Sequence, residues 1–282
     1  MFQQKPISEA WNFVIGVLLI IRAFTSSLIA GAVFLPLYLA GAGIEDSLYA
    51  SIPFFCAAAG GFTLNDYYDL SKDQINKPYR AIPSGRLKPN VALSFGFILI
   101  VVAFVASFLV YRNRFQLLLF LISIGGVTFY GLVTKYFSLS KTILTAAVSV
   151  LPIVYVTERL SYPRTYLLIP IGGLFFLLGR ELLMDIRDIA GDSSSRMKTL
   201  PTVIGSSGTA KIAFTLLGLC GLILIFFTAQ VWSIRNVILT SIILSSSFVV
   251  PYGWSYRKGK YRRSVIISLY IPMLCGILLL MR

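Results

Sequence analysis

The sequence predicts an all-α polytopic membrane protein with about nine transmembrane helices, arranged as two pseudo-repeated four-helix units around a central cavity. Of its 282 residues, 57% are hydrophobic and only 13% are charged, a composition too apolar for a soluble domain of this size. Apolar runs of about 20 residues, the length that crosses ~30 Å of hydrocarbon, recur along the chain. Two charged motifs also repeat in its two halves. These observations indicate a single membrane-embedded domain, residues 1–282.

Nine apolar runs account for the expected spans, and residues 1–19 before them are expected to form an interfacial helix. The pseudo-repeats are expected at about 20–157 and 166–281, with one helix beyond the two four-helix units. The runs lie near residues 20–41, 47–68, 91–111, 115–134, 142–157, 166–186, 209–232, 236–254 and 263–281.

Lysine and arginine are distributed unevenly between the two expected membrane faces. They are about three times as frequent beside the N-terminus and the even-to-odd connections as on the opposite face. Because cytoplasmic connections carry the excess of basic residues, we expect a multi-pass cell-membrane protein with its N-terminus in the cytoplasm. Two connections, at about 69–90 and 187–208, are then cytoplasmic loops that cap the site. The net charge of +14 reflects this orientation, and no nucleic-acid partner is expected.

Acidic residues, in contrast, are concentrated in two windows with the same spacing. Offsets of three and seven place the three aspartates of each window on one helix face. A basic-x-aliphatic-Pro-hydroxyl sequence follows each window, RAIPS at 80–84 and KTLPT at 198–202. The first window contains Asp66, Asp69 and Asp73, and the second contains Glu181, Asp185, Asp188 and Asp192.

Stacked carboxylates repel one another unless cations neutralise them, and acidic residues near lipid are rarely without a function. Oxygen ligands suit hard cations, and Mg²⁺ is usually held by a few carboxylates together with substrate phosphates. The neighbouring basic residues suit an anion whose charge exceeds that of the metal. The pattern therefore predicts a site for a diphosphate attached to an apolar tail. The simpler alternative is that the acids of both windows lie at helix ends or in loops that are exposed to water and bind no ligand.

These motifs resemble those of the UbiA-type intramembrane prenyltransferases. NDYYDLSKD at 65–73 matches the family pattern N-D-x-x-D-x-x-x-D, and DIRDIAGD at 185–192 matches D-x-x-D-x-x-G-D. The segments NKPYRAIPSGRL, KTLP and FYGLVTKY are also similar to the family. The resemblance covers essentially the whole chain, in motif order and helix count.

The resemblance implies a set of site residues around two Mg²⁺ ions. Asp66, Asp69, Asp185 and Asp188 are the expected catalytic residues, and the metal ligands are these four with Asn65, Asp73 and Asp192. The expected diphosphate-binding residues are Lys72, Arg80, Lys135, Arg187 and Lys198. The expected pocket residues are Arg22, Thr25, Tyr130 and Glu181. Aromatic rings that face the allylic cation are expected among Phe129, Tyr130 and Tyr155.

Three positions depart from the family pattern. The family often has a lysine just before the second acidic motif, where this chain has Met184. A Gly-Asn pair that is common at the start of the fifth helix is replaced by Lys141 and Thr142. In the first helix, an Arg followed three residues later by Asn becomes Arg22 and Thr25. The segment GRELLMDIRDIAGD most resembles the archaeal branch that alkylates glycerol phosphate and related bacterial sequences.

The expected function is Mg²⁺-dependent transfer of a prenyl group from a prenyl diphosphate to a lipophilic or aromatic acceptor, in contact with membrane lipids. The chain has no histidine, so the proton would leave to a carboxylate, to the diphosphate or to water. One alternative is a UbiA-type terpene cyclase, which uses the same ionisation. Another is a cation transporter, although that function favours acids at the bilayer midplane on broken helices.

Overall fold

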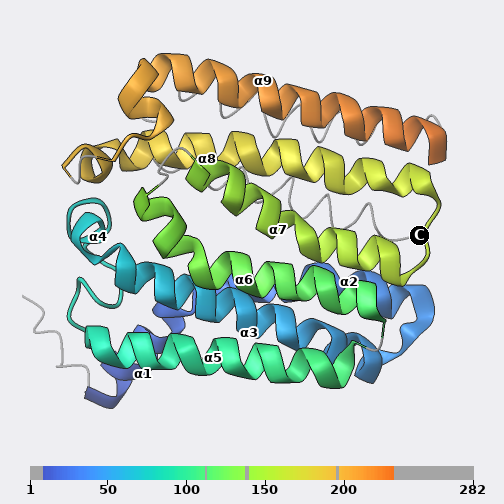
Figure 1. The fold of residues 1–282 in the computed structure, drawn as a ribbon, viewed down its shortest axis with the longest axis horizontal. Helices are drawn as coiled ribbons and strands as arrows, with labels where there is room; N and C mark the ends of the chain where they lie inside the picture. Colours follow the sequence, from blue (N-terminus) through green and yellow to red (C-terminus); the bar gives the residue numbers. More distant parts are fainter. Residues whose placement is uncertain (1–8, 112, 137–139, 195–196, 232–282) are drawn as a thin grey trace, which may run out of the picture.

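A computed structural model describes residues 9–111, 113–136, 140–194 and 197–231, and this part of the chain folds into helices that lie side by side (Figure 1). The fold class predicted from the sequence is confirmed. The elements are α1 (Glu9–Ile20), α2 (Ala23–Leu37), the π-helical turn η1 (Tyr38–Ala42), α3 (Ile44–Tyr68), α4 (Leu70–Asn76), α5 (Pro89–Val110), α6 (Arg114–Tyr136), α7 (Ser140–Arg159), the 3₁₀ turn η2 (Arg164–Leu167), α8 (Leu168–Ser194) and α9 (Leu200–Val231).

Helices that are long and apolar enough to span a membrane make up most of the described chain. Six meet this criterion among the described residues, namely α2 with η1, α3, α5, α7, η2 with α8, and α9. Helix α6 covers the run predicted at 115–134. The runs predicted at 236–254 and 263–281 lie outside the described residues.

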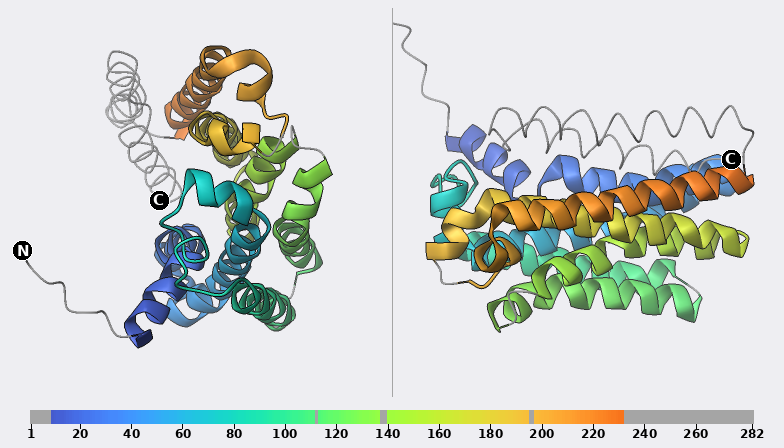
Figure 2. Two further views of the ribbon diagram at one scale, coloured as in Figure 1. Left: turned by 90° about the vertical axis from the view of Figure 1, so that its left-hand side faces the viewer. Right: turned by 90° about the horizontal axis from the view of Figure 1, so that it is seen from above.

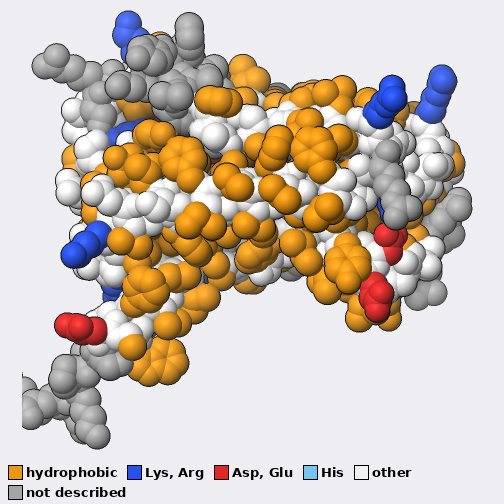
Figure 3. Space-filling model, turned by 60° about the horizontal axis from the view of Figure 1, so that its bottom comes forward, with side chains coloured by type: hydrophobic (Ala, Val, Ile, Leu, Met, Phe, Trp, Pro, Cys, Tyr) orange, Lys and Arg blue, Asp and Glu red, His pale blue; other side chains and the backbone are white. Residues whose placement is uncertain are grey.

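Large apolar side chains cover the long flanks of the bundle. On one face, hydrophobic side chains fill the middle and charged side chains lie toward the two ends (Figure 3). Helix α5 is an example, since Ile98, Val101 and Leu109 are all exposed. A contiguous apolar surface of this kind is suited to contact with lipid rather than with water.

Residues 1–19 were expected to form an interfacial helix, and α1, which ends at Ile20, includes residues 9–19. It exposes Trp11 and Phe13. Helix α1 is separated from α2 by Arg22, whose φ of 45° and ψ of 56° are left-handed. This conformation breaks the helix, because residues other than glycine and asparagine rarely adopt it inside a helix.

The second acidic window is helical, which differs from the capping loop expected at 187–208. Helix α8 continues to Ser194 and α9 already begins at Leu200, although Gly205 has a non-helical φ of 81°. No proline interrupts residues 185–194, so nothing in this sequence ends the helix. The connection after the first window contains Pro78, Pro83 and Gly85, and it runs through α4 into consecutive turns.

Close approach of α8 and α9 depends on Gly179. A Cβ atom at this position would lie 2.8 Å from the carbonyl oxygen of Ala213 and 2.8 Å from Cγ of Leu217. Because a backbone carbonyl cannot move aside as a flexible side chain can, the two helices would have to separate. Small residues allow this kind of packing between helices in membranes.

Gly179→Ala is therefore expected to lower the free energy of unfolding by about 1–3 kcal/mol, the usual cost of overpacking. Thermal unfolding of the detergent-solubilised protein measures the effect. Gly218→Ala on α9, where an added Cβ meets no atom within 4 Å, is the matched control. Equal midpoints for the two variants would contradict the packing role of Gly179.

Candidate functional site

The two acidic windows meet at one end of the bundle. Helices α3 and α8 both end there, and the short helix α4 lies across that end between them (Figures 1 and 2). The first window follows α3 into α4, and the second lies on the last turns of α8. The carboxylates are withdrawn from solvent, since Asp66, Asp73, Asp185 and Asp192 are each 2% exposed.

Two arginines neutralise the first window. Asp66 accepts hydrogen bonds on Oδ1 from Arg22, at 2.8 Å, and from Arg80, at 2.7 Å. The Arg80 guanidinium also donates to Asp73, so it joins the end of α3 to α4. Asp69 forms an ion pair with Lys72. Arg22 lies in addition over the ring of Phe62, 4.5 Å from its centroid, which fixes the guanidinium by a cation–π contact.

The second window is neutralised by residues of three elements. Asp185 accepts from Lys141 Nζ at 3.0 Å and from Thr142 Oγ1 at 2.9 Å, both on α7. Asp188 accepts from Arg187 at 2.6 and 2.9 Å. It also accepts from Lys77, which follows α4, at 2.6 Å.

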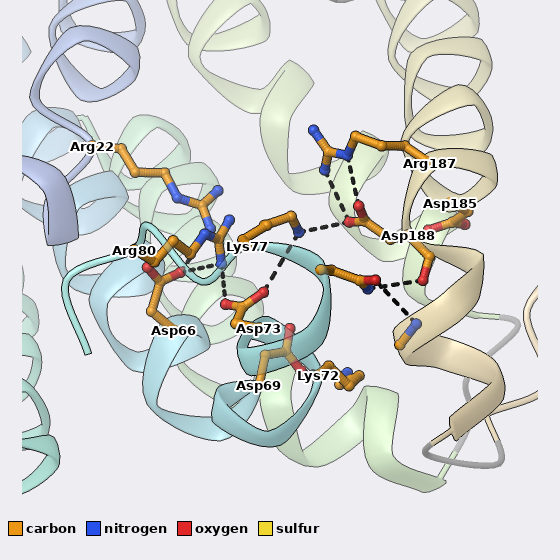
Figure 4. Close-up of polar contacts among 12 residues, drawn as sticks. Arg22, Asp66, Asp69, Lys72, Asp73, Lys77, Arg80, Asp185, Arg187 and Asp188 are labelled. Atoms are coloured by element: carbon orange, nitrogen blue, oxygen red, sulfur yellow. Dashed lines mark hydrogen bonds and ion pairs between the residues drawn. The ribbon is translucent and has the colours of Figure 1, made fainter. Parts of the chain in front are cut away.

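Lys77 connects the two windows. Its ammonium points between Asp188 of α8 and Asp73 of α4, with a longer separation of 3.6 Å to Asp73 (Figure 4). Desolvation by burial, together with the charge of Arg80, lowers the pKa of Lys77, and burial raises the pKa of Asp73 despite the charges of Arg80 and Lys77. The opposite charges nearby favour the ionised form of both groups.

A second connection, which we call the Asn76–Gly191 latch, holds α4 against α8. Asn76 Nδ2 donates to the carbonyl of Asp188 at 2.8 Å, and the Gly191 N–H donates to Asn76 Oδ1 at 3.0 Å. A Cβ atom on Gly191 would lie 2.3 Å from Asn76 Nδ2. The glycine of the DIRDIAGD motif therefore makes room for a side chain from the other window.

The residues of both windows fit Mg²⁺. Their donors are carboxylate and amide oxygens, which hard cations prefer. Two of these oxygens, Asn65 Oδ1 and Asp192 Oδ2, are buried without a hydrogen-bond partner. Within the described ranges, no three acidic side chains converge as a complete metal cage. This arrangement suits a metal that is held partly by substrate phosphates.

Most of the residues predicted from the sequence lie in this charged cluster. Glu181 forms an ion pair with Arg180 at 2.5 Å, and Tyr130 lies beside Lys141 and Thr145. Thr25 is half-buried on α2, and Lys198 is exposed before α9. The side chain of Lys135 is outside the described part of the structure.

Tyr155 lies elsewhere. It is fully buried in an aromatic cluster, with its ring centroid 5.2 Å from Phe54 and 5.0 Å from Tyr111. Phe54 precedes Asp66 by 12 residues on α3, which corresponds to about 18 Å along a helix. The structure thus places Tyr155 away from the acidic windows. Phe129, another aromatic candidate, is 57% exposed.

Four residues of the cluster were not predicted as site residues. Lys77 and Asn76 belong to the quoted NKPYRAIPSGRL segment, which was the available signal for them. The signal for Lys141 and Thr142 was that they replace the Gly-Asn pair of the family pattern. Their contact with Asp185 could not be predicted, because Asp185 is distant in sequence.

Comparison with known proteins decides the family. The model of the UbiA prenyltransferase family matches residues 19–274. The chain belongs to the UbiA prenyltransferase family. The resemblance seen in the sequence is thereby confirmed. With its apolar spanning helices, this UbiA protein is an integral membrane protein.

Curated relatives and solved structures of UbiA proteins are similar to this chain over different lengths. The digeranylgeranylglyceryl phosphate synthase of Saccharolobus solfataricus is 34% identical over 178 residues, 62% of each chain. The protein of the same name from Methanothrix thermoacetophila is 27% identical over 88% of this chain and 85% of its own. A UbiA homolog from Archaeoglobus fulgidus, solved with GPP and Mg²⁺, has a TM-score of 0.72 at 14% identity, covering 94% of this chain and 96% of that one.

Proposed function

We propose that this protein transfers a prenyl group from a prenyl diphosphate to a hydroxyl of a glycerol-phosphate ether lipid, in a Mg²⁺-dependent reaction. The observation that carries the proposal is the meeting of two buried acidic windows with a basic rim at one end of an apolar bundle (Figure 4). A diphosphate with an apolar tail matches both parts of this arrangement. Family membership supports the class of reaction.

The choice of acceptor rests on the relatives. Those from Saccharolobus and Methanothrix are both named digeranylgeranylglyceryl phosphate synthase. The Archaeoglobus homolog was solved with GPP and Mg²⁺, which supports the donor and the metal. We accordingly favour a phosphorylated glycerol ether over an aromatic acceptor.

The proposed metal ligands are the acids of both windows with Asn65, and two ions are proposed, one for each window. When bound, Mg²⁺ would neutralise the negative charge that develops on the leaving diphosphate. Asp66 and Asp73 would then no longer hold Arg80, whose guanidinium is suited to bind phosphate oxygens in a bidentate manner. Lys77 and Arg187 now pair with Asp188, and a metal ion on Asp188 would free them in the same way.

The tail of the donor is proposed to lie along the apolar interior of the bundle, away from water. The C1–O bond of the allylic diphosphate breaks, the acceptor oxygen bonds to C1, and the hydroxyl proton leaves to a carboxylate, the diphosphate or water. The site end and the N-terminus are proposed to face the cytoplasm, because the basic residues concentrate there. The two pseudo-repeats, at about 20–157 and 166–281, are proposed to form one domain.

A product assay tests the proposal. The purified protein with Mg²⁺ is incubated with C10 to C40 prenyl diphosphates, either with geranylgeranylglyceryl phosphate or with 4-hydroxybenzoate, and the products are identified by mass spectrometry. We expect an ether lipid heavier by one prenyl group, formed only with the glycerol-phosphate acceptor. A cyclic hydrocarbon formed without acceptor would favour a terpene cyclase, and product formed only with the aromatic acid would overturn the proposed acceptor.

A further inference from the structure

Lys141 is a largely buried cation in an unfavourable position on its helix. It is the second residue of α7, and its side chain is only 15% exposed. The N-terminus of a helix carries partial positive charge, so a lysine in the first turn does not stabilise the helix. Its position therefore has to be explained by what it faces.

The ammonium of Lys141 faces the second acidic window. Its Nζ donates to Asp185 Oδ1 at 3.0 Å, and the neighbouring Thr142 hydroxyl donates to Oδ2 at 2.9 Å. Asp192 and Tyr130 are also close enough to act on its charge. Lys141 is thus placed among side chains of α6 and α8, although α7 carries neither acidic window.

On α8, the residue just before Asp185 is apolar. Met184 precedes Asp185 directly and is buried. It stands three residues after Glu181 and four before Asp188, and hence on the same helix face as both. The cation that contacts Asp185 comes from α7 instead.

We propose that Lys141 binds the diphosphate of the substrate, a role that rests on the proposed function. A buried ion pair is by itself weak evidence for a stabilising role. If Asp185 holds a metal ion during the reaction, the carboxylate no longer neutralises Lys141. The buried ammonium then requires another anion, and a diphosphate beside Asp185 provides one. Thr142, on the same turn, offers a hydroxyl to the same ligand.

Binding of an unreactive ligand tests this role without turnover. Dissociation constants for geranyl S-thiolodiphosphate and for geraniol are measured by calorimetry, with Mg²⁺ and with EDTA. Lys141→Gln is expected to weaken binding of the thiolodiphosphate about 10- to 100-fold, the range for one charged hydrogen bond, and to leave geraniol binding unchanged. Lys211→Gln, which removes an exposed lysine of α9, is the control and should behave as the wild type.

Unchanged affinity of Lys141→Gln for the thiolodiphosphate would overturn the proposal, as would an equal loss for geraniol. If Lys141→Gln does not fold, Asp185→Asn is compared with Lys141→Gln/Asp185→Asn in EDTA, since removing both charges leaves no unpaired buried ion. Weaker thiolodiphosphate binding by the double variant supports the role, and equal binding excludes it. Absence of a prenyl diphosphate site is distinguishable, because the wild type itself would then not bind the thiolodiphosphate more tightly than geraniol. The choice of acceptor does not enter this experiment and is tested by the product assay alone.

Discussion

Asp66→Asn and Asp185→Asn are each expected to lower the rate of prenyl transfer by at least about 10²–10³-fold, as removal of a group that stabilises developing charge does. Asparagine retains the shape of the side chain and loses the charge that attracts a hard cation. In the first window, it also leaves Arg22 and Arg80 without the carboxylate that both now contact. Initial rates with saturating donor and acceptor measure the effect.

A control substitution is available on α3, at the end opposite to Asp66. Asp46, in the first turn of α3, pairs with Arg159 at 2.9 Å, and its side chain is 51% exposed. Asp46→Asn is expected to keep the wild-type rate, since an exposed ion pair contributes little. EDTA should abolish turnover of the wild type, and excess Mg²⁺ should restore it. Full activity of Asp66→Asn or of Asp185→Asn would refute the proposed metal ligands.

Gly191→Ala is expected to have the second large effect, because it removes the Asn76–Gly191 latch. The new Cβ would lie 2.3 Å from Nδ2 of Asn76, so the side chain must leave and α4 loses its hold on α8. Lys77, the next residue, then shifts relative to Asp188. We expect a fall in kcat/KM of about 100-fold, the cost of misplacing reacting groups by about 1 Å.

A double variant separates the clash from the loss of glycine. Asn76→Ala alone removes both hydrogen bonds but no longer fills the space over Gly191. Gly191→Ala/Asn76→Ala should therefore be no less active than Asn76→Ala, a strongly non-additive result. Gly221→Ala, where an added Cβ meets no atom within 4 Å, controls for alanine in a helix. Additive losses in the double variant would show that Gly191 acts independently of Asn76.

The sequence predicted those features that depend on local spacing. Helix length and apolarity are local properties, so the spans were found, and the i, i+3 and i+7 acids identified both windows. What was missed depends on contacts between distant segments. Asn76 and Gly191 are far apart in sequence and meet only because α4 crosses the end of α8. Tyr155 was chosen by residue type, although the expected topology puts it near the end of its span that is remote from the even-to-odd connections and the site.

Lys77 also constrains how the two halves of the protein can diverge. One ammonium serves a carboxylate from each half, Asp73 and Asp188. A substitution in either acidic window changes the electrostatic environment of the other through this shared partner, so the effects of mutations in contact are not independent. Although the halves carry similar motifs, substitutions at Asp73, Lys77 and Asp188 are therefore not independent of one another. Among homologues, we expect changes at these three positions to occur together.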